Sequence, residues 1–573
     1  MKKLCLFFLL ACLSTVLWSV PAERVLRRLP MADGTWVQAR LVGDEHYAWF
    51  ETPEGRILEE TDAGYVFSND DADAVRATAR KARRLEVRRI GSQSTAPLPA
   101  LGSPRIPVIL VSFSDSVFHA RETDEELLAY YNLYCNGTRD GQHYTAHGSD
   151  GAIRDYYEDQ SRGAFSPEFV VVGHVRLDNP ESTYGRNTSS KKQGSDADFS
   201  GFCRDAVTKA MSEFDVDWSQ FANRGYNRVD MVLFIFAGCG EHNGGATSAL
   251  WPKWKTLGFQ VNGVTFYSGL CSSENKPKMN GDGYVTSVKP EGIGVLCHEL
   301  NHALGLPDFY DINYKGFGMD IWSIMDFGQY AGNSYTPVAM TAYEREFMGW
   351  ETMQELTTAG WLTLEPTATT GKGYKIVNPA NANEYYIIEN RQAVGWDRAV
   401  CDFGHGLMVT HVDYDAGKWS GNTVNTDVDH QRMTIIAANN RYYGTCVAKE
   451  DEGAELIKTW NGNLYPFEGN DSLTAYSTPA ATVFTAAGFM RKDLNGICEN
   501  PDGSVSVYFG DGYKTAVGIG EVPQEGLESE GARGIVYDLT GRRLAQPTTK
   551  GLYIVDGRKV YVPGQNIRKV IRK

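Results

Sequence analysis

The stretch from Val295 to Asp311, VLCHELNHALGLPDFYD, constrains the fold more than any other part of this chain. His298 and His302 lie four residues apart, and on a helix this spacing puts both imidazoles on one face, where they can share a metal ion. Gly305 suits the left-handed residue at which a helix ends. The spacing therefore predicts a helix that carries two metal ligands and is followed by a chain reversal.

A third metal ligand is expected beyond this reversal. Asp308 is available there, and an aspartate oxygen is an accepted zinc ligand. Asp311 competes for the same role; we prefer Asp308 as the ligand and expect Asp311 to support the site or to cap a turn. Met325, within the sequence WSIMDFG, is expected in a turn beneath the metal.

Glu299 is the predicted general base. It follows the first histidine and lies about 100° around the helix axis from it, so its carboxylate can reach a water on the metal without binding the metal itself. Zinc lowers the pKa of such a water toward about 7. Glu299 can then accept a proton from the water and later pass it to a leaving amine.

Length and charge limit the remaining possibilities. A chain of 573 residues is too long for a single core, which predicts two to four domains. The net charge of −15 argues against nucleic acid as a partner, since a phosphate backbone needs a basic face. The cysteines show no CxxC spacing, and the pairs Cys239–Cys271 and Cys401–Cys446 are those considered for disulfide bridges.

The N-terminus has the pattern of an export signal. Two lysines precede an apolar run, and small residues follow, so residues 1–22 are expected to be a signal peptide cleaved after Ala22. The sequence LLAC, ending at Cys12, could instead be a lipoprotein box, but the apolar run continues past this cysteine. The protein is therefore expected to be secreted or held at the cell surface.

Residues 23–103 are expected to form a pro-segment and linker. Alternating apolar and polar residues separated by turn signals predict a strand-rich meander, followed by a basic helix and a Ser/Pro/Gly-rich linker. An ordinary N-terminal domain is the alternative. The segment contains no cysteine that could bind the metal, so either steric blockage or an acid must silence the site; the candidate acids are Asp33, Asp44, Glu45, Glu54 and Asp62. The basic stretch Lys81–Arg89 offers trypsin-like cleavage sites for its release.

The rest of the chain falls into three regions. Strands alternate with helices over residues 104–350, which predicts an α+β catalytic domain with a mixed sheet. Short strands separated by turn residues over 351–510 predict an all-β sandwich with no helices. Residues 511–573 are expected to form a small separate β unit.

The motif residues give the chain a resemblance to metzincin zinc peptidases, and more closely to the immune-inhibitor-A-type family of secreted metalloendopeptidases, whose pattern is HExxHxxGxxD followed by a Met-turn. The stretches AIRDYYEDQSRGAFSPEF, FIFAGCGE and YYIIENRQAVGWD agree with this family, and the resemblance covers roughly residues 23–510. It implies a zymogen and a two-lobed metzincin-like zincin domain. The matching positions are His298, Glu299, His302, Gly305, Asp308 and Met325.

Two positions depart from that pattern. Where many relatives carry an acidic, glycine-rich loop suited to calcium, this chain has ANRGYN at 222–227, so calcium is possible but doubtful. Where some metzincins have a tyrosine two residues after the methionine, this chain has Phe327; Tyr330 or Tyr335 could take that tyrosine's role. The C-terminal segment resembles type IX secretion sorting domains, which implies secretion machinery as a partner; an accessory β-domain is the alternative.

The expected function is that of a secreted zinc endopeptidase, made as a zymogen, which acts as a monomer on protein or peptide substrates. One alternative is a surface binding protein with an inactive peptidase domain, whose β-sandwich grips host proteins or glycans. Another is a metal enzyme that cleaves a non-peptide amide, such as a cell-wall crosslink.

Overall fold

The computed structural model describes residues 17–45, 47–84, 95–145, 147–189, 192–442 and 457–513, together with four short strands between 536 and 562. The chain divides into two compact units, residues 1–513 and 514–573. Several sequence predictions lie wholly or partly outside the described residues. These include the signal peptide up to residue 16 with Cys12, the basic stretch and linker over 85–94, Cys446, and most of the C-terminal segment.

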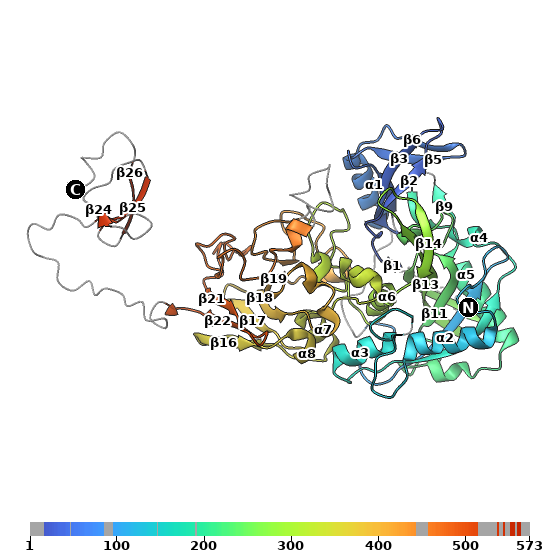
Figure 1. The fold of residues 1–573 in the computed structure, drawn as a ribbon. Coiled ribbons are helices and arrows are strands. Elements are labelled where there is room, and N and C mark those ends of the chain that lie inside the picture. The colour runs from blue at the N-terminus through green and yellow to red at the C-terminus, as the bar shows by residue number, and fades with distance from the viewer. Residues whose placement is uncertain are drawn as a thin grey trace, which may run out of the picture. The chain divides into compact units, whose positions relative to one another are not determined.

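The N-terminal region forms an antiparallel sheet, as its alternating pattern predicts. Its strands are β2 (Leu26–Pro30), β3 (Trp36–Asp44), β4 (Tyr47–Glu51), β5 (Ile57–Thr61) and β6 (Gly64–Phe67), and α1 (Ala72–Arg84) follows. The sheet continues through β10 (Lys192–Asp196) and β9 (Asn187–Ser189), because β10 pairs with β4. Backbone hydrogen bonds therefore join the N-terminal region to the region that follows it (Figure 1).

A mixed sheet forms the centre of the next region. Its main strands lie in the order β1-β12-β13-β11-β7-β8, and β14 pairs with β13. The bounds are β1 (Leu17–Ser19), β7 (Arg105–Ser112), β8 (Glu168–Arg176), β11 (Val232–Cys239), β12 (Lys253–Val261), β13 (Val264–Met279) and β14 (Val285–Pro290). The central strands β7, β8, β11 and β13 run parallel, while β12 and β14 are antiparallel to β13.

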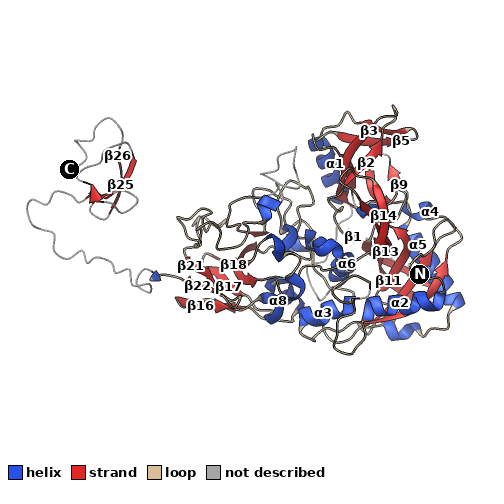
Figure 2. Ribbon diagram, viewed as in Figure 1, coloured by secondary structure: helices blue, strands red, loops and turns tan. Residues whose placement is uncertain are grey.

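Helices cover both faces of this sheet, because its central strands are apolar on both sides. Val108 and Leu110 pack into a core with α2 (Asp124–Asn136), α3 (Ile153–Ser161) and α6 (Gly294–Ala303). The alternate residues Ile109 and Val111 pack into a second core with α5 (Phe199–Glu213). The region thus has a layered α/β arrangement, with α6 beside the sheet (Figure 2).

Further β-sheets follow, after α7 (Ala342–Met348). A five-stranded sheet contains β15 (Gln354–Glu355), β17 (Tyr374–Asn378), β18 (Asn381–Arg391), β19 (Gly406–Asp413) and β20 (Met433–Ile435), and a three-stranded sheet contains β16 (Gly360–Leu364), β21 (Leu494–Glu499) and β22 (Val505–Phe509). Residues of both sheets share one hydrophobic core. The prediction that helices stop after Trp350 was wrong, because α8 (Thr367–Thr370) and α9 (Ala416–Ser420) lie here as single turns too short for the pattern to reveal.

The second unit contains a four-stranded antiparallel sheet, in the order β24-β23-β25-β26. Its strands are β23 (Val536–Tyr537), β24 (Arg543–Leu544), β25 (Gly551–Val555) and β26 (Arg558–Val562). A small β unit at the C-terminus is what the sequence predicts.

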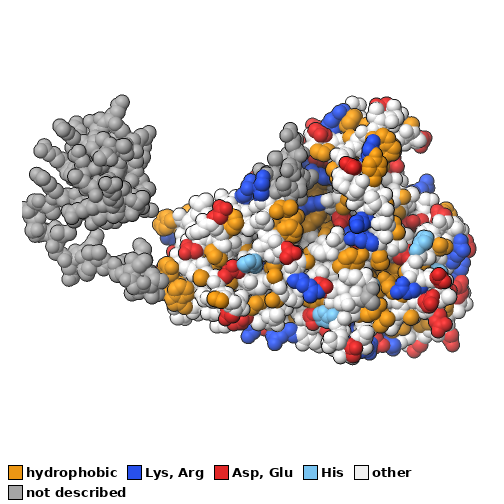
Figure 3. All heavy atoms as spheres, in the orientation of Figure 1, with side chains coloured by type: hydrophobic (Ala, Val, Ile, Leu, Met, Phe, Trp, Pro, Cys, Tyr) orange, Lys and Arg blue, Asp and Glu red, His pale blue; other side chains and the backbone are white. Residues whose placement is uncertain are grey.

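Three further observations concern the described chain as a whole. Among the described helices, none combines the length and apolar character that crossing a membrane requires. Cys239, Cys271 and Cys401 carry free thiols, so the pairing of Cys239 with Cys271 was wrong. In the parallel register of β11 and β13, Cys239 lies opposite Asn275 and Cys271 lies opposite Phe234, which keeps the two thiols apart. Acidic and basic side chains are interspersed on the face drawn in Figure 3.

Candidate metal centre

The metal centre is built on α6, every residue of which is buried. The helix begins at Gly294, where close packing leaves no room for a side chain, since a Cβ there would lie 1.9 Å from the carbonyl oxygen of Gln329. It ends just before Gly305, whose φ of 106° is one that side-chain-bearing residues rarely adopt. The chain then turns back and places Asp308 beside the two histidines of the helix.

The three predicted ligands come together in the structure. His298 Nε2 and His302 Nε2 are 3.1 Å apart, and Asp308 Oδ1 lies 3.2 Å from the first and 3.3 Å from the second. Zinc bonds of about 2.0–2.2 Å at tetrahedral angles separate neighbouring ligand atoms by about 3.3–3.5 Å. The spacing of the three atoms fits one tetrahedrally bound zinc ion.

Backbone carbonyl groups orient both imidazoles. Nδ1 of His298 lies 2.8 Å from the oxygen of Ile324, and Nδ1 of His302 lies 2.8 Å from the oxygen of Leu306. Each Nδ1 therefore donates its hydrogen to a carbonyl oxygen, which leaves the lone pair of each Nε2 directed toward Asp308. Burial lowers the pKa of His298, which favours the neutral ring that a metal requires.

Asn422, from a distant part of the chain, holds Asp308, the third candidate ligand. Its Oδ1 accepts a hydrogen bond of 2.8 Å from the backbone N–H of Asp308, and its Nδ2 donates one of 2.6 Å to Asp308 Oδ2. Asp308 Oδ1 is thereby left to face the imidazoles. Burial works to raise the pKa of Asp308, but the two imidazoles outweigh it and keep the pKa below its ordinary value. Sequence reasoning missed Asn422, because no local pattern marks a residue 114 positions away.

Asp311 is occupied elsewhere. Its Oδ1 accepts the backbone N–H of Asn313, and its Oδ2 accepts those of Lys315 and Gly316. The side chain therefore stabilises the loop that follows Asp308, which agrees with a turn-capping role. Among the described residues, the group whose ligand atoms converge contains His298, His302 and Asp308.

The turn around Met325 supports both ends of the metal-binding stretch. Met325 is fully buried, and its carbonyl oxygen accepts the N–H of Phe309, directly after Asp308. The preceding residue, Ile324, accepts the hydrogen bond from His298. This turn therefore fixes one histidine and the aspartate relative to each other.

Glu299 lies on α6 between the two histidines and is completely buried. Its Oε2 accepts the backbone N–H of Trp254 on β12, and its Oε1 accepts the N–H of Val20, both at 2.7 Å. Burial raises the pKa of Glu299 well above its ordinary value, and the negative charges of Glu45 and Asp308 raise it further. The carboxyl group is thus suited to holding a proton.

Residues 17–23 run past Glu299, and Leu17–Ser19 among them form β1. β1 pairs antiparallel with β12, so that Ser19 lies opposite Lys253. Beyond it, Trp251 Nε1 donates a hydrogen bond of 3.1 Å to the oxygen of Val20, and the hydroxyl of Tyr330 donates one of 2.7 Å to the oxygen of Pro21. Tyr330 thus lies beside the peptide at Glu299, whereas the hydroxyl of Tyr335 donates to the oxygen of Pro290.

The carboxylates that flank residues 222–227, where relatives carry the calcium-type loop, bind neighbouring parts of the chain. Asp230 accepts hydrogen bonds from the N–H of Arg224 and from Arg228, and Asp217 accepts the N–H of Ser219. Both carboxylates therefore stabilise the local chain.

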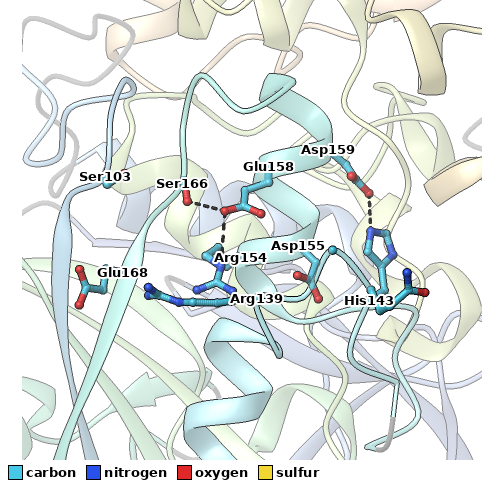
Figure 4. A pocket seen from close by; sticks show the side chains of 11 residues that line it. Ser103, Arg139, His143, Arg154, Asp155, Glu158, Asp159, Ser166 and Glu168 are labelled. Atoms are coloured by element: carbon cyan, nitrogen blue, oxygen red, sulfur yellow. Dashed lines mark hydrogen bonds and ion pairs between the residues drawn. The ribbon is translucent and has the colours of Figure 1, made fainter.

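A separate polar cavity of about 520 Å³ lies beside α3 (Figure 4). Arg154 pairs there with Glu158, and His143 pairs with Asp159. None of the metal-centre residues lines it.

The region that contains the candidate site is similar to known peptidases. The model of the immune inhibitor A peptidase M6 catalytic domain matches residues 100–354. Immune inhibitor A of Bacillus thuringiensis subsp. alesti is 29% identical over 34% of this chain and 31% of its own length. The pre-pro-metalloprotease PrtV of Vibrio cholerae is 27% identical over 34% of this chain and 23% of its own length. The chain thus spans under a third of the length of these relatives. Residues 100–354 are therefore similar to the catalytic domain of the immune inhibitor A peptidase M6 family.

Proposed function

We propose that this protein is a secreted zinc-dependent endopeptidase, made as a zymogen, that hydrolyses peptide bonds in proteins. The observation that carries this proposal is the convergence of His298, His302 and Asp308 at distances that fit zinc, with Glu299 on the same helix. The family match and the names of the relatives support the same reaction class. The proposed fold of this region is metzincin-like, with the turn at Met325 as its Met-turn.

Zinc held by the three ligands would act as a Lewis acid, polarising the scissile carbonyl group and making water a stronger nucleophile at neutral pH. Glu299 takes the proton from the attacking water as the new C–O bond forms. It then delivers that proton to the amide nitrogen as the C–N bond breaks, so that the amine leaves neutral. The hydrogen bond between Val20 N–H and Glu299 supports this role, because a backbone nitrogen reaches the carboxylate at 2.7 Å.

The edge of the central sheet is the proposed binding place for substrate. Residues 17–19 pair antiparallel with β12, and a substrate strand would add to the sheet edge in the same way. Trp251 and Tyr330 then bind substrate carbonyl oxygens on the C-terminal side of the cleaved bond, as they bind those of Val20 and Pro21. Peptide binding by backbone hydrogen bonds suits an enzyme that acts on extended segments of proteins.

The zymogen proposal rests on N-terminal residues that lie along the proposed substrate path. Glu23 and Arg24, at the start of the proposed pro-segment, contact the catalytic region: the N–H of Glu23 donates to the oxygen of His242, and Arg24 pairs with Asp320. Glu45, at the turn between β3 and β4, is the candidate acid whose charge acts on Glu299. Residues before 104 would therefore block substrate until they are removed. The type IX route of export remains a proposal that rests on the sequence of the C-terminal segment.

The test uses the processed protein as it is secreted. We expect about one zinc per chain, chelator-sensitive cleavage of casein, and loss of cleavage by about 10²–10⁴-fold in Glu299→Ala with zinc retained. Cleavage that persists in this variant would contradict the mechanism. A processed wild-type protein that is fully loaded with zinc but cleaves nothing would instead favour a binding protein with an inactive peptidase domain.

A further inference from the structure

Arg24 directly follows the peptide that runs past Glu299, and its side chain enters a site made by the catalytic region. Its Nη1 lies 3.0 Å from Asp320 Oδ1, and its guanidinium carbon lies 3.5 Å from the ring centroid of Phe327. The Asp320 side chain is fully buried, whereas about a fifth (22%) of the Arg24 side chain is exposed. A cation is thus held between a buried carboxylate and the face of an aromatic ring.

The site is acidic without Arg24. Asp320 Oδ2 is buried and has no hydrogen-bond partner. A second buried carboxylate, Asp326, accepts the N–H groups of Met319 and Asp320 through its Oδ2. Burial and then the charge of Asp320 raise the pKa of Asp326, while Arg24 opposes this shift. Within the described part of the chain, Arg24 is the cation that pairs with Asp320.

The backbone of Asp320 also indicates a functional constraint. Its φ is 47°, in the left-handed region that aspartate adopts only uncommonly. Such conformations are more frequent at ligand-binding sites than elsewhere, because the surrounding structure must hold them in place. Here the carboxylate so positioned faces the guanidinium of Arg24. A cavity of about 70 Å³ lies beside this pair, lined by Arg24, Asp326 and Phe327 among others.

Removal of the N-terminal segment would empty this site. Arg24 lies within residues 23–103, which the proposed function assigns to the pro-segment. Without it, Asp320 would keep a partly desolvated negative charge and lose its counter-charge, which is unfavourable unless another cation takes the place. The segment also approaches the site as a peptide chain, so the natural replacement is a basic side chain on another peptide.

We propose that Asp320 and Phe327 form a substrate subsite for an arginine or lysine side chain, which Arg24 occupies in the precursor. The proposal rests on the proposed peptidase function. Because the amide of Val20 contacts Glu299, a substrate that follows the same path carries its basic residue at the fifth position after the cleaved bond. Arginine is preferred over lysine, because a planar guanidinium both stacks on the Phe327 ring and pairs with the carboxylate.

The test compares quenched fluorescent peptides of one sequence that carry Arg, Lys, Gln or Glu at this fifth position. With the processed protein we expect kcat/KM to be about tenfold higher for Arg than for Gln, with Glu lowest. In Asp320→Asn the ratio of Arg to Gln should fall toward one; asparagine tolerates the left-handed backbone, so this variant is the mildest available. Asp178→Asn, whose side chain is 94% exposed, is the matched control and should keep the wild-type ratio.

The outcomes separate the two proposals. Chelator-sensitive cleavage of all four peptides at similar rates by the wild type would overturn the subsite and leave the peptidase function in place. The absence of chelator-sensitive cleavage of any peptide would contradict the peptidase function itself. Equal preference for Arg in the wild type and in Asp320→Asn would also overturn the subsite. So would a calcium ion that the wild-type protein binds and Asp320→Asn does not. If Asp320→Asn does not fold, Phe327→Leu provides the same comparison.

Discussion

The side chain of Asn422 makes two hydrogen bonds to Asp308. Its Oδ1 accepts the backbone N–H of Asp308, and its Nδ2 donates to the Asp308 carboxylate. Asn422 follows α9 in the β-sheet region, whereas Asp308 follows α6, the helix that carries both histidines. The geometry of the candidate metal centre therefore depends on the β-sheet region as well as on the residues of the motif. Groups that orient metal ligands in this way typically affect metal affinity strongly.

Replacing Asn422 should weaken metal binding without removing a ligand. In Asn422→Ala, Asp308 loses the hydrogen bond that fixes Oδ2, and we expect zinc affinity to fall by about 10–100-fold, measured by competition with a chromogenic chelator. Asn422→Asp keeps an acceptor for the Asp308 N–H but places two carboxylates together, so it should weaken binding at least as much. Unchanged affinity in both variants would show that the contact is dispensable.

The two aspartates after Gly305 should respond differently to truncation. Asp308→Ala removes a ligand and should abolish stoichiometric zinc, measured by elemental analysis after dialysis. Asp311→Ala should retain zinc and lose about 1–3 kcal/mol of stability, because three backbone N–H groups of its loop lose their acceptor. The reverse pattern would identify Asp311 as the ligand.

A buried arginine should be essential for the stability of the large unit. Arg391, on β18, pairs with Glu389 and Asp397 and donates to the oxygen of Ala339 at 3.0 Å, and all three charged side chains are buried. Arg391→Met removes the cation that pairs directly with both buried carboxylates, so we expect a loss of about 3–5 kcal/mol in chemical denaturation.

The matched control for this variant is Arg398→Met. Arg398 pairs with Asp150 at the surface, and its side chain is 53% exposed, so its removal should cost at most about 1 kcal/mol. Similar losses in the two variants would argue against the special importance of burial.

His147 should make the protein sensitive to acid. Its ring is buried between Tyr134 and Tyr144, and neither ring nitrogen has a hydrogen-bond partner. Burial lowers its pKa from 6.5 to about 4. Between these values the unfolded chain binds a proton that the folded chain excludes, so stability is lost as pH falls through this window, by up to about 3 kcal/mol.

The comparison is the free energy of unfolding at pH 7.5 and at pH 4.5. His147→Phe should lose part of the pH dependence, because a phenyl ring fills the space and cannot bind a proton. His119→Phe, whose side chain is 71% exposed in the wild type, should keep the wild-type dependence. An unchanged pH dependence in His147→Phe would exclude this histidine as the cause.

The convergence of His298, His302 and Asp308 was predictable because its main signal is local. The spacing of His298 and His302 fixes their common face on any helix, and Gly305 fixes where that helix ends, so the fold only has to bury the helix. Asn422 was not predictable, because nothing in the sequence around it distinguishes it from other asparagines. The choice of Asp308 over Asp311 gains support from contacts that only a folded chain possesses.

Predictions were incomplete where one sequence pattern is compatible with two structures. An apolar run at an N-terminus suits both an export signal and an edge strand, and Leu17–Ser19 lies in the predicted signal yet pairs with β12. Cleavage after Ala22 stays a prediction. The thiols of Cys239 and Cys271 lie on neighbouring strands, but pairing depends on strand register, which spacing along the chain does not give.

The hydrogen bonding of β10 to β4 has a consequence for how activation would proceed in time. A cut in the basic stretch Lys81–Arg89 breaks the chain but leaves the N-terminal sheet attached through its shared strands. Cleavage of the chain and the onset of activity are then separate events. The cleaved protein persists as a non-covalent complex, and dissociation of the N-terminal region limits the rate of activation. Dilution or mild denaturant, rather than more of the activating protease, should shorten the lag.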